Sequence, residues 1–207
     1  MSATIQCKPN GPYLVKGTVN VKNSRGETVA TDAVFALCRC GGSATKPFCD
    51  ATHRKNGFSD ARISDGKDDK LKSYAGRGIT VLDNRSICAH AGHCTEGLPA
   101  TFREEGKPWI DPDGAEVAAV IATIGRCPSG ALNYSTNGKV AETPAREPGI
   151  TVTKDGPYAV VGGVELLEAR WAEGATHEHY TLCRCGASKN KPFCDGSHWD
   201  AGFKDGA

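Results

Sequence analysis

The stretch that decides the fold is Cys183-Arg-Cys-Gly-Ala-Ser-Lys-Asn-Lys-Pro-Phe-Cys-Asp-Gly-Ser-His198, near the end of the 207-residue chain. A second copy, Cys38-Arg-Cys-Gly-Gly-Ser-Ala-Thr-Lys-Pro-Phe-Cys-Asp-Ala-Thr-His53, lies 145 residues earlier. The match runs without a gap from Gly11 to Phe58 of the first copy, where 23 of 48 positions are identical. The identities concentrate on Cys, His, Gly and Pro, which a metal site and its loops need. The chain therefore contains a duplicated unit with chemistry at matching positions.

Each copy has the spacing Cys-x-Cys, eight residues, Cys, three residues, His. Residues i and i+2 of an extended segment point to the same side, and residues i and i+4 of a helical turn are neighbours. Asp50 and Asp195 stand where such a turn begins and are expected to cap its backbone amides. Three Cys and one His fit one tetrahedral zinc or a two-iron cluster, and spacing alone does not separate the two. The candidate ligands are Cys38, Cys40, Cys49 and His53, and Cys183, Cys185, Cys194 and His198.

The pattern Cys-x-Cys-x₂-Ser-x₃-Pro-x-Cys-Asp-Gly-Ser-His resembles the CDGSH iron–sulfur domain of the mitoNEET type. The second copy matches throughout, and the first departs at Ala51 and Thr52 while keeping all four ligand positions. The resemblance implies a [2Fe-2S] cluster in each copy. In the first copy, it implies that Cys38 and Cys40 hold the inner iron and that Cys49 and His53 hold the outer one. In the second copy, Cys183 and Cys185 would hold the inner iron, and Cys194 and His198 the outer one.

The segment between the copies carries Cys88-Ala-His-Ala-Gly-His-Cys94 and, 33 residues later, Cys127-Pro128. This order resembles a divergent single-cluster ferredoxin domain, in which C-x₂-C-x₂-C is followed by a remote Cys-Pro. Ala91 occupies the position of the middle cysteine. Three cysteines favour a [3Fe-4S] cluster, since a [4Fe-4S] cluster would need His90, His93 or a water as fourth ligand. The alternative is that Cys88, Cys94 and Cys127 are buried reduced thiols.

The expected domains are a CDGSH unit over residues 1–62, a ferredoxin-like insert over 74–136 and a second CDGSH unit over 150–207. Polar stretches at 59–73 and 137–149 are expected linkers. Residues 34–37 and 179–182 are expected strands that run into each Cys-Arg-Cys, and 13–21 is an expected β segment interrupted by glycine. In the insert, 79–82 is an expected strand. A capping box at Asp113 and Glu116 should precede a helix with apolar residues at 117, 120, 121 and 124, which Gly125 ends.

The expected fold class is α+β. The CDGSH resemblance implies that the two β-rich units form a β-cap over two cluster-binding lobes, related by a twofold axis. Because both units lie in one chain, we expect a monomer with an intramolecular pseudo-dimer. The ferredoxin-like α+β insert should lie at one side.

The 25 Lys+Arg residues nearly balance the 24 Asp+Glu residues, which argues against a generic nucleic-acid binder. No apolar run approaches the roughly 20 residues that span a bilayer, and the first residues lack a signal pattern. A cytoplasmic protein without membrane contact is therefore expected. Ten closely spaced cysteines in a reducing compartment favour metal binding over disulfides.

Three clusters in one short chain predict a non-enzymatic electron carrier, since no catalytic constellation or nucleotide-binding glycine motif is present. One alternative is a protein that transfers clusters or senses iron or redox state. Another is a structural zinc module for protein interaction. The partner would be a redox protein or an apo-acceptor that the sequence does not name. His177 and His179 are expected on a strand and facing solvent, with a role close to a metal as the alternative. Arg39 and Arg184 either offset thiolate charge or form surface salt bridges.

Overall fold

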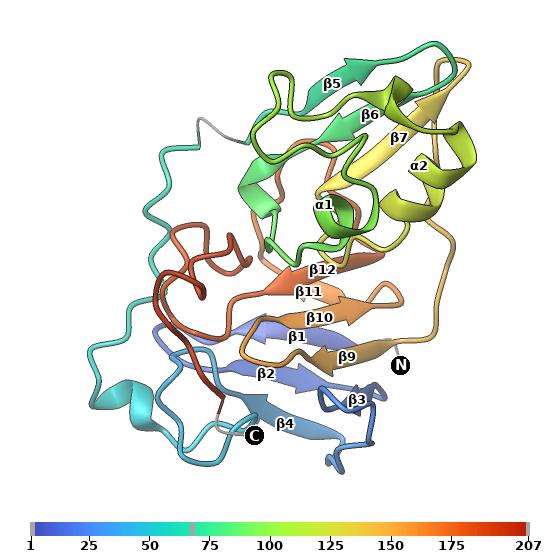
Figure 1. The fold of residues 1–207 in the computed structure, drawn as a ribbon. Helices are drawn as coiled ribbons and strands as arrows, with labels where there is room; N and C mark the ends of the chain where they lie inside the picture. The colour runs from blue at the N-terminus through green and yellow to red at the C-terminus, as the bar shows by residue number, and fades with distance from the viewer. Residues whose placement is uncertain (1–2, 67–68, 206–207) are drawn as a thin grey trace.

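The computed structural model describes residues 3–66 and 69–205, which form three four-stranded sheets with few helices (Figure 1). The first sheet has the order β11-β1-β2-β4, from Glu165–Leu167, Thr4–Cys7, Tyr13–Lys16 and Val34–Leu37. The second has the order β12-β10-β9-β3, from His179–Leu182, Tyr158–Val161, Gly149–Val152 and Asn20–Lys22. This composition agrees with the expected α+β class.

The insert forms the third sheet, with the order β5-β6-β7-β8 from Lys72–Ala75, Thr80–Asp83, Leu132–Thr136 and Lys139–Val140. Two α-helices, α1 (His93–Gly97) and α2 (Val117–Ile124), lie beside it (Figure 1). Short 3₁₀ turns occur at Thr52–Arg54, Arg85–Ile87 and Pro112–Gly114. The strands expected at 34–37 and 179–182 are confirmed, and the one expected at 79–82 is found one residue later. No helix in the described part of the chain is long and apolar enough to cross a membrane.

Each repeat lends its third strand to the sheet of the other. Strand β3 of the first repeat pairs in parallel with β9 of the second, and β11 of the second pairs in parallel with β1 of the first. The chain turns toward the other sheet at Gly17 and Gly162, which have positive φ angles of 93° and 79°. The segment expected as one interrupted β stretch is thus two strands in different sheets.

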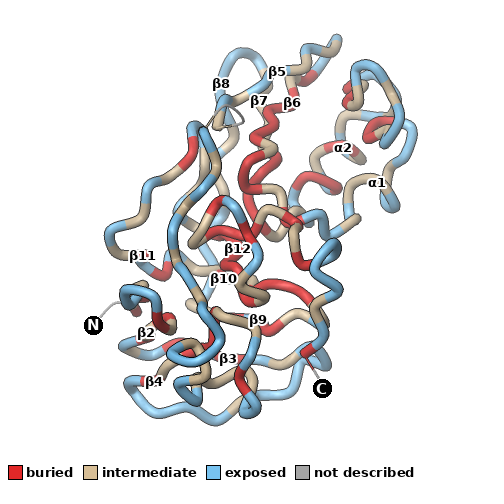
Figure 2. Tube along the Cα trace, turned by 90° about the vertical axis from the view of Figure 1, so that its left-hand side faces the viewer, coloured by how far each residue is buried: buried red, intermediate tan, exposed pale blue. Residues whose placement is uncertain are grey.

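The two repeats share one core, visible as the buried strands of Figure 2. The rings of Tyr13 and Tyr158 meet edge to face, with centroids 6.1 Å apart. The Tyr13 hydroxyl donates to the carbonyl oxygen of Cys183 at 2.9 Å, and the Tyr158 hydroxyl donates to that of Cys38 at 2.8 Å. Each repeat therefore fixes the start of the ligand loop in the other.

The helix expected at 117–124 is confirmed as α2, with Val120 and Ile124 buried in the core of the insert and Gly125 directly after it. The capping box is wrong. Glu116 is the N-cap residue but makes no side-chain cap bond. Asp113 instead accepts a hydrogen bond from the backbone N–H of Arg77 at 2.9 Å. The Asp113 carboxylate therefore binds Arg77, which is distant in sequence, and does not cap α2.

Arg39 and Arg184 are buried, so neither forms the expected surface salt bridge. Arg39 donates to the carbonyl oxygens of Lys8 and Gly11, each at 2.7 Å, and Arg184 makes the same two bonds with Thr153 and Gly156. Each arginine also pairs with a carboxylate at 2.8 Å, Asp60 in the first repeat and Asp205 in the second. Both arginines tie the loop before β2 or β10 to the end of their repeat.

Replacing Arg184 with Met should destabilise the protein more than the matched change Arg39→Met. The side chain of Asp205 is 4% exposed, whereas that of Asp60 is 29% exposed and keeps part of its hydration. Removing one partner of a buried ion pair costs about 3–5 kcal/mol, and the cost is smaller when the carboxylate that remains keeps contact with water. Urea unfolding of both variants measures the difference, and an equal or larger loss in Arg39→Met would contradict it.

Candidate metal centres

The first pair of candidate ligands directly follows strand β4. The Sγ atoms of Cys38 and Cys40 lie 3.7 Å apart, as expected for residues i and i+2 of extended chain. Gly41 then turns the chain with a φ of 77°. A Cβ at this glycine would lie 2.5 Å from the carbonyl oxygen of Cys185, so only glycine allows the two ligand loops to approach this closely.

The second pair of the first repeat is brought together by a capped turn. The Asp50 carboxylate accepts backbone hydrogen bonds from Thr52 at 2.9 Å and from Ala44 at 2.8 Å, which confirms the expected cap. These bonds hold the pKa of Asp50 well below its usual range, and the bond from Ala44 has the largest effect. The turn places the Nδ1 atom of His53 at 3.4 Å from the Sγ atom of Cys49.

The second repeat has the same two pairs. The Sγ atoms of Cys183 and Cys185 lie 3.8 Å apart, and Cys194 Sγ lies 3.5 Å from His198 Nδ1. Asp195 accepts backbone hydrogen bonds from Ser197 at 3.0 Å and Lys189 at 2.8 Å. Burial raises the pKa of the Asp195 carboxyl, but these bonds outweigh it and lower the pKa overall.

The four pairs fit the donor spacing of a tetrahedral metal. Metal bonds of about 2.3 Å to thiolate and about 2.0–2.1 Å to imidazole give a sulfur–sulfur edge of about 3.8 Å and a sulfur–nitrogen edge of about 3.6 Å. The observed distances are 3.7 and 3.8 Å for the Cys–Cys pairs and 3.4 and 3.5 Å for the Cys–His pairs. Among the described residues, no group of three or more His, Cys, Asp or Glu is arranged to hold one metal ion. The observed distances join the donors of each repeat in two pairs.

Burial and hydrogen bonding shift the pKa values of the ligand thiols. Burial raises the pKa of Cys194 to about 12, and burial also raises the pKa of Cys38. The hydrogen bond between Cys183 and Cys185 keeps the proton on Cys183, raising its pKa, and lowers the pKa of Cys185 to about 6. A metal ion that binds here replaces these protons and removes the cost of burying thiolate charge.

The two repeats differ in how far the outer pair is covered. Cys49 and His53 are half-buried and border an open cleft of about 900 Å³. Cys194 and His198 are buried, with exposed fractions of 2% and 5%. Two sites with the same donors therefore have different access to solvent.

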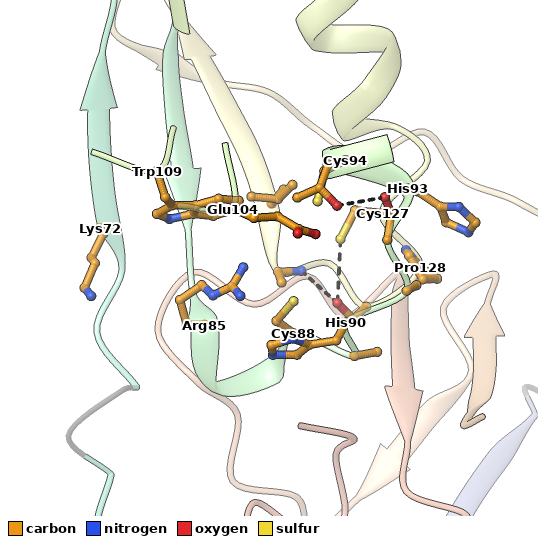
Figure 3. A pocket seen from close by; sticks show the side chains of 17 residues that line it. Lys72, Arg85, Cys88, His90, His93, Cys94, Glu104, Trp109, Cys127 and Pro128 are labelled. Atoms are coloured by element: carbon orange, nitrogen blue, oxygen red, sulfur yellow. Dashed lines mark hydrogen bonds between the residues drawn. The ribbon is translucent and has the colours of Figure 1, made fainter. Parts of the chain in front are cut away.

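The three cysteines of the insert lie on the wall of one cavity of about 460 Å³ (Figure 3). Cys88 follows the 3₁₀ turn Arg85–Ile87, Cys94 lies in α1, and Cys127 follows α2. Burial, opposed by Arg85, raises the pKa of Cys88 to about 11, and the charges of Cys127 and Cys94 add to the increase. The structure thus brings together all three predicted residues.

The cavity offers no fourth cysteine, because Ala91 lines it at the matching position. The ring of His93 points away from the three cysteine side chains, and the carboxylate of Glu104 points toward the cavity (Figure 3). The ring of His90 packs against Gly196 of the second repeat. The His93 ring therefore points away from the cysteines, whereas His90 lines the cavity with its ring against Gly196.

A charged and aromatic group forms the opposite wall of this cavity. The Arg85 guanidinium stands 4.5 Å from the centroid of the Trp109 ring. Trp109 donates its indole N–H to the carboxylate of Asp83 at 3.2 Å. Burial raises the pKa of Asp83 to about 6, although Arg85 and Trp109 lower it. Arg85 is the nearest positive group that could offset negative charge in the cavity, and sequence spacing alone did not identify it.

Comparison with known proteins divides the chain in the same way. Residues 10–54 and 155–199 match the family described as iron-binding zinc finger, CDGSH type. Each of these two segments is a CDGSH iron-binding domain. Residues 74–137 match the family described as divergent 4Fe-4S mono-cluster. Two CDGSH domains therefore flank one mono-cluster domain, as the resemblance in the sequence predicted.

Curated relatives of this CDGSH protein cover part of the chain. The uncharacterized protein YjdI of Escherichia coli strain K12 is 45% identical over 67 residues, which are 32% of this chain and 88% of YjdI. YjdI of Escherichia coli O157:H7 matches to the same extent. No solved structure matches the chain.

His179 is a site residue that the sequence analysis placed wrongly in solvent. It lies in β12 of the second CDGSH domain, is buried, and hydrogen-bonds to the backbone of Cys127. Its Nδ1 atom lies 3.1 Å from the carboxylate of Glu178, which also pairs with Arg146. The repeat gives no hint of burial, because His179 aligns with Val34, the first residue of β4, which is exposed. Its contact with the insert has no sequence signal.

Proposed function

We propose that the protein is a non-enzymatic electron carrier in which each CDGSH domain holds a [2Fe-2S] cluster and the insert holds a third cluster. The observation that carries this proposal is the division of each CDGSH ligand set into two pairs with the spacing of a tetrahedral edge. Two sulfide-bridged irons need two protein ligands each, whereas one zinc needs four together. The inner irons would take Cys38 and Cys40, and Cys183 and Cys185; the outer irons would take Cys49 and His53, and Cys194 and His198.

When bound, such clusters accept and release single electrons. The protein holds the ligand residues rigidly, because hydrogen bonds close each ligand loop. Ser43 and Ser188 donate hydrogen bonds at 2.7 Å to the carbonyl oxygens of Phe48 and Phe193, closing each loop between its two ligand pairs. Rigid donors keep the same geometry in both oxidation states, which favours electron exchange without rearrangement.

For the insert we propose Cys88, Cys94 and Cys127 as the only protein thiolate ligands, and a [3Fe-4S] cluster. Support comes from Ala91 at the fourth position and from the His93 ring, which points away from the three cysteine side chains. A [4Fe-4S] cluster, which the family description names, would need a ligand other than cysteine at its fourth iron.

Replacing Ala91 with Cys should convert the middle cluster to a four-iron form. The new thiolate would supply the missing ligand at the position that a cysteine occupies in ordinary ferredoxins. EPR of anaerobically prepared, oxidised protein should show a three-iron signal in the wild type and lose it in the variant. A wild-type protein without that signal contradicts the three-iron assignment but leaves the three ligands in place.

Iron and sulfide analysis tests the proposal as a whole. Two two-iron clusters and one three-iron cluster give roughly seven iron atoms per chain. The expected protein is red-brown, and redox titration should resolve two-iron signals that disappear in Cys49→Ala and Cys194→Ala one at a time. A colourless protein with bound zinc would instead support the structural zinc module.

Cluster transfer is a second candidate function, because the outer pair of the first CDGSH domain borders an open cleft. A cluster held there could be reached by an apo-acceptor. Incubation with an apo-ferredoxin separates the two functions. Electron transfer leaves the iron content of this protein unchanged, whereas cluster transfer lowers it by one two-iron cluster.

We also propose that the two CDGSH domains are related by a pseudo-twofold axis within a monomer. The reciprocal strand pairs and the reciprocal tyrosine hydrogen bonds support this arrangement. Sedimentation of the loaded protein at a single-chain mass would be the expected result.

A further inference from the structure

The insert docks both of its ligand loops on the second CDGSH domain. In the first loop, the carbonyl oxygen of His90 accepts a hydrogen bond from the indole N–H of Trp199 at 3.1 Å. In the second, a Cβ at Gly130 would lie 2.6 Å from Thr176 Cγ2 and 3.1 Å from the carbonyl oxygen of His179. A third bond joins the side-chain amide of Asn190 to the carbonyl oxygen of Ser86 at 2.6 Å.

The ring of His90 contacts the turn between Cys194 and His198 of the second CDGSH domain. A Cβ built on Gly196 would lie 2.6 Å from Cδ2 of His90, so the turn has space for this ring only because residue 196 is glycine. The matching residue of the first domain is Ala51, which is exposed and has a φ of 67°. The left-handed turn therefore tolerates alanine, and glycine at 196 serves the contact with His90.

His90 also connects ligands of two different centres by short stretches of chain. It lies two residues after Cys88 of the middle site, and Gly196 lies two residues from both Cys194 and His198. The backbone of His90 has a φ of 52°, in the left-handed region that few residues other than glycine adopt.

We propose that His90 is a positioning residue that couples the middle site electronically to the second CDGSH site rather than to the first. The inference rests on the proposed function. One electron would leave the centre on one side of the His90–Gly196 contact and reduce the centre on the other, with no bond or proton exchanged. Electronic coupling falls more steeply across a gap than along bonds, so the ring contact matters.

Two single variants each leave two of the three centres in place, so that electron transfer within one pair of centres can be measured alone. Cys49→Ala keeps the middle site and the second CDGSH site, and Cys194→Ala keeps the middle site and the first. After flash reduction of the loaded proteins, the rate at which an electron equilibrates between the two remaining centres is measured optically. EPR relaxation of the reduced two-iron signal reports the spacing of the centres independently. The Cys49→Ala protein should equilibrate several-fold faster and relax faster than the Cys194→Ala protein.

His90→Asn tests the residue within the Cys49→Ala background. Asparagine accepts a positive φ and keeps the backbone bond to Trp199, but it lacks the ring that reaches Gly196. We expect equilibration to slow several-fold while EPR relaxation and iron content stay unchanged. His93→Asn is the matched control, because its ring points away from the three cysteines, and it should change neither quantity (Figure 3).

Gly196→Ala provides a second variant, since Ala51 shows that the turn accepts alanine and only the His90 ring is displaced. It should slow equilibration as His90→Asn does. An unchanged rate in both variants, or an equal rate in the two backgrounds, overturns the inference while the proposed carrier function stands. Loss of iron in His90→Asn would also overturn it, because His90 would then be a cluster ligand. A protein without iron and sulfide overturns both.

Discussion

A ferrous chelator should remove iron from the first CDGSH domain much faster than from the second. Both sites have three Cys and one His, so the strength of the metal–ligand bonds does not distinguish them. Access to the chelator distinguishes the two sites, because Cys49 and His53 border an open cleft whereas Cys194 and His198 are buried beneath the insert. If local opening of the second site costs about 1.4 kcal/mol more than opening of the first, the rates differ roughly tenfold.

The measurement is the decay of visible absorption after a chelator is added at neutral pH. Wild-type protein should lose its two-iron absorption in two phases. The fast phase should be missing in Cys49→Ala, and the slow phase should be missing in Cys194→Ala. Gly196→Ala should accelerate the slow phase because it displaces the His90 ring that covers the turn. A single phase in wild-type protein would show that burial of the outer pair does not control iron loss.

Replacing His53 and His198 together with Cys should lower the reduction potentials of both two-iron clusters. Imidazole ligation raises the potential of two-iron centres relative to all-cysteine ones, so the loss should be on the order of 100 mV. In both domains Nδ1 faces the cysteine, which leaves Nε2 to exchange a proton. Reduction adds negative charge and raises the proton affinity of Nε2, so the wild-type potential should fall as pH rises.

The double variant should lose this pH dependence and release its clusters more slowly in mild acid, since protonation can no longer free an imidazole ligand. Redox titration at several pH values and absorption decay in acid give the two readouts. The single variants assign each effect to its domain, and His93→Ala serves as control because that ring points away from the cysteine side chains (Figure 3). A double variant that matches the wild type in both readouts would exclude His53 and His198 as ligands.

Local pattern was enough to predict the parts of the fold that depend on neighbours in sequence. The strands before each Cys-Arg-Cys and helix α2 follow from short-range periodicity, and the caps at Asp50 and Asp195 follow from the start of a turn. The exchange of β3 and β11 did not follow, because a glycine break leaves the direction of the next strand open.

The same limit applies to the candidate sites. Spacing identified the ligand pairs, since each pair is two or four residues apart. The burial of Arg184 and His179 depends on contacts with residues far along the chain. The cover over the second site depends on His90, whose partner Gly196 lies in another domain. Long-range packing leaves no periodic mark, so these roles required the structure.

The exchange of third strands has a consequence for synthesis on the ribosome. Strand β1 emerges first, yet its parallel neighbour β11 is made only when translation reaches Glu165–Leu167. At about 5–20 residues per second, the edge of β1 waits roughly 8–35 s for that partner. The nascent first domain therefore passes through a stage in which its loops exist without the tyrosine hydroxyl that later fixes them from the other repeat.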